Sequence, residues 1–108
     1  MFELWFRPKW EDETWPDGSP RRTILVSKNS SRLRFTHTAY KLETGLGGRW
    51  SAQSEGMDQI YWDLEADGGK LTLHLEHYLG ISIFVGHDSG DQHQPSMRLL
   101  ERAFGVLW

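Results

Sequence analysis

Apolar and polar residues alternate most regularly in the middle third of the chain. Two apolar runs flank an Ala-Asp-Gly-Gly turn, and every second residue of each run is apolar: Ile60, Trp62, Leu64, Leu71, Leu73 and Leu75. A period of two is typical of strands that bury one face, and a short glycine-containing turn between two such runs predicts a β-hairpin. A four-residue loop at 66–69 brings all of these side chains onto one face, which fixes the register of the hairpin.

The same alternation extends to neighbouring strands on both sides of the hairpin. A three-residue turn at 78–80, with Gly80 in the left-handed region, adds the alternating apolar residues of 81–85 to the same face. Trp50 and Ala52 indicate a further strand before the hairpin. We therefore expect an antiparallel meander with one face exposed to water.

The N-terminal part of the chain predicts two strands separated by a loop. Residues 2–7 alternate as in a half-buried strand, which Pro8 ends. Residues 9–20 carry several charges and a Pro-Asp-Gly turn signal, which favour a loop. Residues 22–27 are β-branched and apolar, as in a buried strand.

Two helices are predicted outside the meander. Residues 29–31 are good N-caps, and glycines at 45, 47 and 48 provide a C-terminal stop. Between them, apolar residues recur at helical spacing: Phe35, Ala39, Leu42 and Leu46. A strand remains an alternative here, because residues 33–39 also alternate. Pro95 suits the first turn of a second helix, whose apolar stripe would cover the meander.

These elements predict a single α+β domain over residues 1–108. The expected order is β-β-α-β-β-β-β-α, with two helices on one face of an antiparallel sheet. The chain has no cysteine, which excludes disulfides and thiolate sites and fits a reducing compartment. Its first residues lack the apolar core of a signal peptide, and no apolar run approaches the ~20 residues of a membrane span. We expect a cytoplasmic protein.

Charge is distributed unevenly along this acidic chain, whose isoelectric point is about 5.9. Residues 21–50 hold seven basic and one acidic side chain, whereas residues 51–93 hold one basic and eight acidic ones. A basic helix lying on an acidic sheet accounts for this pattern within one fold. Arg32 and Arg34 of the first predicted helix keep nucleic-acid binding as an alternative, although nucleic-acid-binding domains are usually strongly basic.

The segment from residue 10 to residue 15 is the first candidate binding site. It interleaves tryptophans with carboxylates: Trp10, Glu11, Asp12, Glu13 and Trp15. On a loop, such residues suit recognition of a basic protein surface, because aromatic side chains supply contact area and acidic groups steer the encounter. In the competing interpretation, both indoles fold back onto the domain.

The hairpin register defines a second candidate on the face opposite the leucines. This polar row consists of Tyr61, Asp63, His74, Glu76 and Tyr78, with Gln59 and Thr72 as cross-strand neighbours. A histidine beside carboxylates and phenols suits acid–base catalysis. The simpler interpretation is ordinary cross-strand pairing on a solvated sheet.

Metal and cofactor sites find no support in the sequence. His74 and His77 are three residues apart on a strand, so their imidazoles point to opposite faces and cannot share an ion. The polar loop at 87–93 matches no calcium-loop spacing. We expect no metal and no cofactor.

Four segments together carry a resemblance to known proteins: Gly48-Arg-Trp50, Asp58-Gln-Ile-Tyr-Trp62, Leu71-Thr-Leu-His-Leu-Glu76 and Gly80-Ile-Ser-Ile83. In this strand pattern the chain resembles small bacterial α+β proteins of uncharacterised families, some of which are immunity proteins that neutralise a toxin. The resemblance implies a protein-binding role and assigns no residue. The leading hypothesis is a non-enzymatic module that docks a basic protein partner, and the alternatives are a small enzyme using His74 and a nucleic-acid-binding protein.

Overall fold

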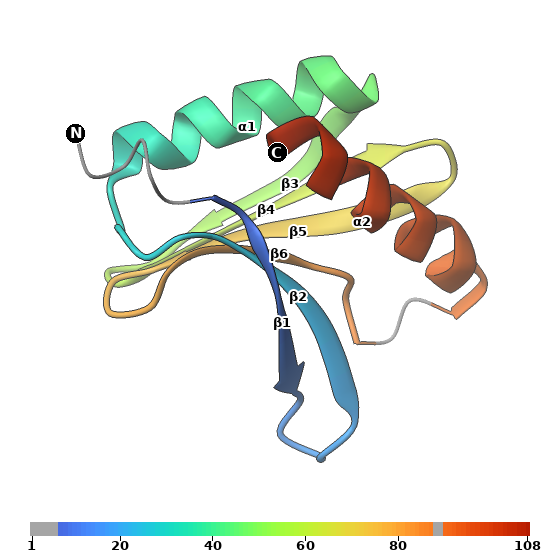
Figure 1. The fold of residues 1–108 in the computed structure, drawn as a ribbon, viewed down its shortest axis with the longest axis horizontal. Helices are drawn as coiled ribbons and strands as arrows, with labels where there is room; N and C mark the ends of the chain where they lie inside the picture. The colour runs from blue at the N-terminus through green and yellow to red at the C-terminus, as the bar shows by residue number, and fades with distance from the viewer. Residues whose placement is uncertain (1–6, 88–89) are drawn as a thin grey trace.

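The computed structural model describes residues 7–87 and 90–108. Within these ranges the chain forms six strands, two α-helices and one short 3-10 helix (Figure 1). In chain order they are β1 (Lys9–Thr14), β2 (Pro20–Ser27), α1 (Arg32–Leu46), β3 (Arg49–Glu55), β4 (Gln59–Ala66), β5 (Gly69–Glu76), β6 (Gly80–Phe84), η2 (Gly90–Gln92) and α2 (His93–Leu107).

The strands form one antiparallel sheet in the order β1-β2-β6-β5-β4-β3. Strands β3 to β6 are the predicted meander, and the β1–β2 hairpin extends it beyond β6. Both helices lie on the same side of the sheet, and the β1–β2 hairpin curves away from the rest of it (Figure 1). The predicted α+β class and the order of elements are confirmed.

The register of the β4–β5 hairpin is the predicted one. Trp62 lies opposite Leu73, and the other apolar pairs follow in step. The connection is nevertheless shorter than expected, because Ala66 and Gly69 already pair and only Asp67 and Gly68 form the turn. Both turn residues take positive φ angles, 52° and 79°, as a type I′ turn requires. Removing one residue from each side of the loop leaves the register unchanged.

The β5–β6 turn lies one residue earlier than predicted, at 77–79. Glu76 therefore pairs with Gly80, and Leu75 pairs with Ile81. Gly80 takes the expected left-handed conformation, with φ of 99°. The apolar residues of β6 face the helices as predicted, because this shift changes the pairing by an even number of residues.

The predicted loop at 9–20 is wrong for its first half. Residues 9–14 form β1, which pairs with β2 from Thr14 opposite Pro20 to Lys9 opposite Leu25. Trp10 stacks on Phe104 of α2, with ring centroids 5.0 Å apart. This contact joins residues far apart in the chain, so local turn signals could not reveal it. The strand predicted at 2–7 lies, apart from its last residue, outside the described residues.

Local caps establish α1 as a helix and not a strand. The Ser31 side chain accepts a hydrogen bond from the backbone N–H of Arg34 at 3.3 Å, and Gly47 ends the helix with φ of 69°. The buried residues of α1 include the predicted stripe from Phe35 to Leu46. In the described parts of the chain, neither helix has the length and apolar character needed to cross a membrane.

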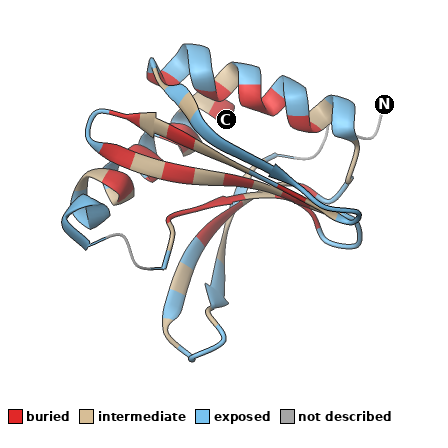
Figure 2. Ribbon diagram, turned by 180° about the vertical axis from the view of Figure 1, so that it is seen from behind, coloured by how far each residue is buried: buried red, intermediate tan, exposed pale blue. Residues whose placement is uncertain are grey.

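The hydrophobic core lies between the helices and the central strands. Buried and half-buried residues alternate along the whole of β5, and Figure 2 shows this alternation. Leu73 of β5, Ile83 of β6 and Leu100 of α2 are all essentially inaccessible to water. The alternation buries one face of the sheet and leaves the other face available for polar chemistry.

Two turn glycines provide a matched test of the packing. Gly80→Ala should lower the free energy of unfolding by about 3 kcal/mol or more, because a Cβ there would lie 2.1 Å from the carbonyl oxygen of Ser27. Gly68→Ala should cost only about 1 kcal/mol, since its Cβ would meet no atom within 4 Å and only the positive φ is penalised. Urea denaturation measures both values. Equal losses would show that β2 does not pack against the β5–β6 turn as described.

Candidate functional site

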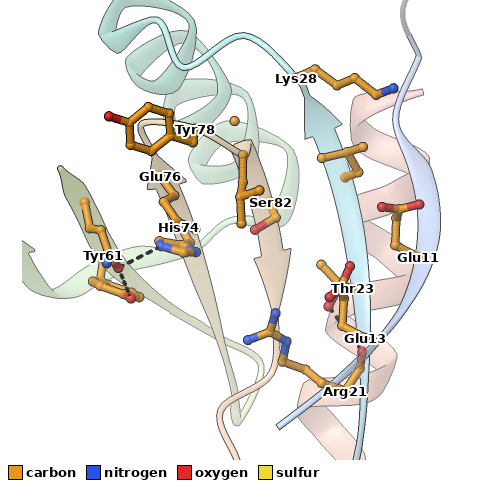
Figure 3. A pocket seen from close by; sticks show the side chains of 14 residues that line it. Glu11, Glu13, Arg21, Thr23, Lys28, Tyr61, His74, Glu76, Tyr78 and Ser82 are labelled. Carbon is orange, nitrogen blue, oxygen red and sulfur yellow. Dashed lines mark hydrogen bonds between the residues drawn. The ribbon is translucent and has the colours of Figure 1, made fainter. Parts of the chain in front are cut away.

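The sheet face that points away from the helices is hollowed into a groove of about 560 Å³. We call it the open-face groove. Side chains of β1, β2, β4, β5, β6 and the β5–β6 turn line it, among them Glu11, Glu13, Arg21, Lys28, Tyr61, His74, Glu76, Tyr78, Leu79 and Ser82 (Figure 3). The groove exists because the β1–β2 hairpin curves relative to the meander and forms one of its walls.

The groove brings together residues from both candidate sites of the sequence. Glu11 and Glu13 of β1 line one wall, and four members of the polar row line the opposite part: Tyr61, His74, Glu76 and Tyr78. Asp63 and Asp12 are not among the lining residues. Asp63 instead accepts a hydrogen bond from the Thr72 hydroxyl at 2.8 Å. Two segments about fifty residues apart in the chain thus contribute to one surface.

The two tryptophans of the first candidate site pack within the domain. Both are half-buried. Trp10 lies on the helix side of the sheet against Phe104, whereas Trp15 meets the ring of Phe84 edge-on at 5.7 Å. Of the two interpretations of these indoles, the structure shows that they fold back onto the domain. Glu11 and Glu13, not the indoles, reach the groove.

His74 lies at the centre of the polar row and is held by its neighbours on β4. Its ring stacks on Tyr61 with centroids 4.3 Å apart and planes only 6° from parallel. Its Nε2 lies 3.3 Å from Oε1 of Gln59, which also accepts a hydrogen bond from the Tyr61 hydroxyl. Phe84 of β6 packs against the other side of the ring at 5.9 Å. These contacts fix the orientation of the imidazole.

The surroundings of His74 favour its neutral form. Burial lowers the pKa of His74 below the ordinary 6.5, because a partly dehydrated imidazolium loses solvation. Glu76 acts in the opposite direction and raises the pKa, whereas the positive charge of Arg21 lowers it further. The groove therefore contains an uncharged imidazole at neutral pH.

Carboxylates outnumber cations around the groove. Glu11, Glu13 and Glu76 face Arg21 and Lys28. None of the five forms an ion pair with another residue that the structure describes. The groove therefore has more negative than positive charges, and none of them is held in a direct ion pair among the described residues.

Arg21 and Ser82 are groove residues that sequence reasoning did not assign to a site, and Phe84 packs against His74 and Arg21 beside them. Ser82 lies opposite His74 across the β5–β6 pair, and Phe84 lies between Thr72 of β5 and Thr23 of β2. The β2–β6 pairing that brings Arg21 here joins segments about sixty residues apart. No local pattern in the sequence reports such a pairing.

The structure gives less support to the nucleic-acid and metal sites considered from the sequence. On α1, Arg32 donates to both carboxylate oxygens of Glu55 at 2.9 and 2.8 Å, so Arg32 is already paired. Within residues 7–87 and 90–108, no group of three or more histidine, aspartate or glutamate side chains is arranged to hold a metal ion.

No protein-family model, curated protein or solved structure matches this chain. The chemistry of the groove is therefore the basis on which a function can be proposed.

The titration of His74 tests the electrostatics of the groove. By NMR its pKa should lie below 6.5; Glu76→Gln should lower it further and Arg21→Gln should raise it. Folded His74 releases its proton at lower pH than the unfolded chain, so the free energy of unfolding should fall as the pH drops from 6.5 toward the folded pKa. His74→Gln should remove that part of the pH dependence.

Glu101→Gln is the matched control, because Glu101 lies on α2 and does not line the groove. It should leave the titration of His74 unchanged. Two results would contradict this assignment: a pKa of His74 at or above 6.5, or a pKa that neither Glu76→Gln nor Arg21→Gln changes. Either would show that the imidazole is fully hydrated and does not lie in the groove.

Proposed function

We propose that this protein is a non-enzymatic binding module that docks a basic protein partner in the open-face groove. One observation carries the proposal: Glu11, Glu13 and Glu76 converge on one concave surface without an ion-pair partner among the described residues. Carboxylates in this arrangement attract a cationic surface and raise its rate of encounter.

Exposed apolar side chains at the end of the groove support the same proposal. Tyr78 and Leu79 are 84% and 68% exposed, and Tyr61 is 40% exposed. Tyrosine is common among the residues that dominate binding energy, because it buries a large area at a small entropic cost. Aromatic anchors beside unneutralised carboxylates are the combination that a basic protein partner requires.

An immunity-type role is one form of this proposal. In that role the acidic and aromatic groove would cover a basic surface of a toxin and block its access to substrate. The resemblance of the strand pattern to small bacterial α+β proteins suggests this role, and the charge of the groove is compatible with it. The proposed binding surface includes Glu11, Glu13 and Glu76 and excludes the two indoles.

A catalytic role for His74 is the second candidate. It is favoured by the lowered pKa of this residue inside a groove. The described residues, however, place no carboxylate in hydrogen bond with the ring, and its Nε2 contacts the side-chain amide of Gln59. A histidine that acts as a general base is usually oriented by a carboxylate and touches a nucleophile. A catalytic role would need an orienting carboxylate and a nucleophile in contact with the ring, whereas a binding role needs neither.

Substitutions at the groove should separate binding from folding. Tyr78→Ala and Glu76→Lys should each raise the Kd for the partner at least tenfold, about 1.4 kcal/mol, because they remove an anchor and reverse a steering charge. The partner would be captured by cross-linking in the cells that produce the protein, and the Kd measured by calorimetry with purified proteins.

Tyr40→Ala is the matched control. Tyr40 is also an exposed tyrosine, 65% accessible, but it lies on α1 and away from the groove. Its substitution should leave the Kd unchanged. A Kd that changes with Tyr40→Ala and not with Tyr78→Ala would move the interface to the helical face and overturn the proposal.

A further inference from the structure

Arg21 is held in the groove by two aromatic rings. It lies on β2 opposite Glu13, and its side chain reaches toward the middle of the groove, on the side of His74 and Ser82 (Figure 3). The central carbon of its guanidinium is 4.4 Å from the ring centroid of Phe84 and 5.0 Å from that of Trp15. Stacking on aromatic rings restrains the planar group and leaves its N–H donors directed outward at its edges.

These donors are not satisfied within the described residues. Arg21 forms no ion pair there, and its buried Nε has no hydrogen-bond partner. A guanidinium carries five N–H donors, and leaving a buried one unpaired costs stability. The structure thus contains an ordered cation whose hydrogen-bonding capacity is unused.

The neighbouring arginine on β2 has the partner that Arg21 lacks. Arg22 also stacks on a tryptophan, with its guanidinium 3.8 Å from the Trp10 ring. Arg22 additionally pairs with Glu101 of α2 at 3.6 Å. Of two adjacent arginines on one strand, the one facing the helices has a carboxylate partner, and the one facing the groove has none among residues 7–87 and 90–108.

We propose that Arg21 binds the carboxylate group of a ligand that enters the open-face groove. A carboxylate can accept two parallel hydrogen bonds from one edge of a guanidinium, which matches both its geometry and its charge. The hydroxyl of Ser82, which also lines the groove, is available as a further donor. This site stands whether or not the ligand belongs to a protein partner, so it goes beyond the proposed function.

The charge of the groove selects a carboxylate over a phosphate. Glu11, Glu13 and Glu76 line the same groove and would repel a dianion more strongly than a monoanion. The same glutamates favour a ligand that carries a positive group next to its carboxylate. The ligand class is therefore a carboxylate flanked by cationic groups, which an acidic side chain between lysines or a chain terminus after lysines can provide.

NMR titration of the whole protein with small anions tests the site. Sodium acetate, added at constant ionic strength against sodium chloride, should shift the Arg21 Nε–H signal saturably and should raise the pKa of nearby His74. A blocked Lys-Glu-Lys peptide and a Lys-Lys peptide with a free carboxyl end should bind more tightly than acetate. Whichever peptide binds more tightly identifies the source of the carboxylate.

Substitutions on β2 assign the effect to one side chain. Arg21→Gln should weaken the tighter peptide at least tenfold, and Arg21→Lys, which keeps the charge but loses the planar fork, should also weaken it. Arg22→Gln is the matched control and should leave the affinity unchanged. If Arg21→Gln does not fold, the saturable shift of the Arg21 Nε–H signal in the wild-type protein still tests the site.

Any one of three results would overturn the proposal. The first is an Arg21 Nε–H signal that responds to acetate no more than to chloride. The second is an Arg22→Gln variant that binds as weakly as Arg21→Gln, and the third is inorganic phosphate that binds more tightly than every carboxylate probe. Each result can occur while a basic protein still docks on the groove, so failure of this site and failure of the proposed function are distinguishable.

Discussion

The alternation of apolar and polar side chains along β4, β5 and β6 is the constraint on which the rest of the structure depends. It places Trp62 and Leu73 against the helices and, one residue away, Tyr61 and His74 on the opposite face. A slip of one residue in this pairing would exchange the two sets. It would bury the imidazole in an apolar core and expose the leucines, and both changes are strongly unfavourable. The register therefore decides at once where the core lies and which side chains are free to bind.

The β1–β2 hairpin converts this flat polar face into a groove. On the helix side it is anchored by Trp10 stacked on Phe104. On the open side Phe84 packs against both Trp15 and Arg21. The hairpin is thus fixed from both faces, and its curvature brings Glu11 and Glu13 opposite the polar row. The same ring contacts hold Arg21 in place, and no described carboxylate pairs with it. The packing of the hairpin therefore also orders the cation that is proposed to bind the ligand.

The sequence predicted the parts of this arrangement that depend on local pattern, and missed those that depend on distant contacts. The register of Trp62 with Leu73 follows from alternation and a short turn, even though the turn proved to be only Asp67 and Gly68. Strand β1 was missed because its charged residues resemble a loop until β2 and α2 are in place. The groove was missed for the same reason: Glu11, Glu13 and Arg21 approach His74 only through the pairing of β2 with β6.

Nuclear Overhauser effects between aromatic rings test the register most directly. The register predicts a strong effect between the ring protons of Tyr61 and His74, whose centroids are 4.3 Å apart, and another between Trp62 and Phe35 of α1, at 5.0 Å. Effects from the His74 ring to Phe35 or to the leucines of α2 would place the imidazole on the helix side of the sheet. That result would contradict the sorting of the two faces, and with it the groove.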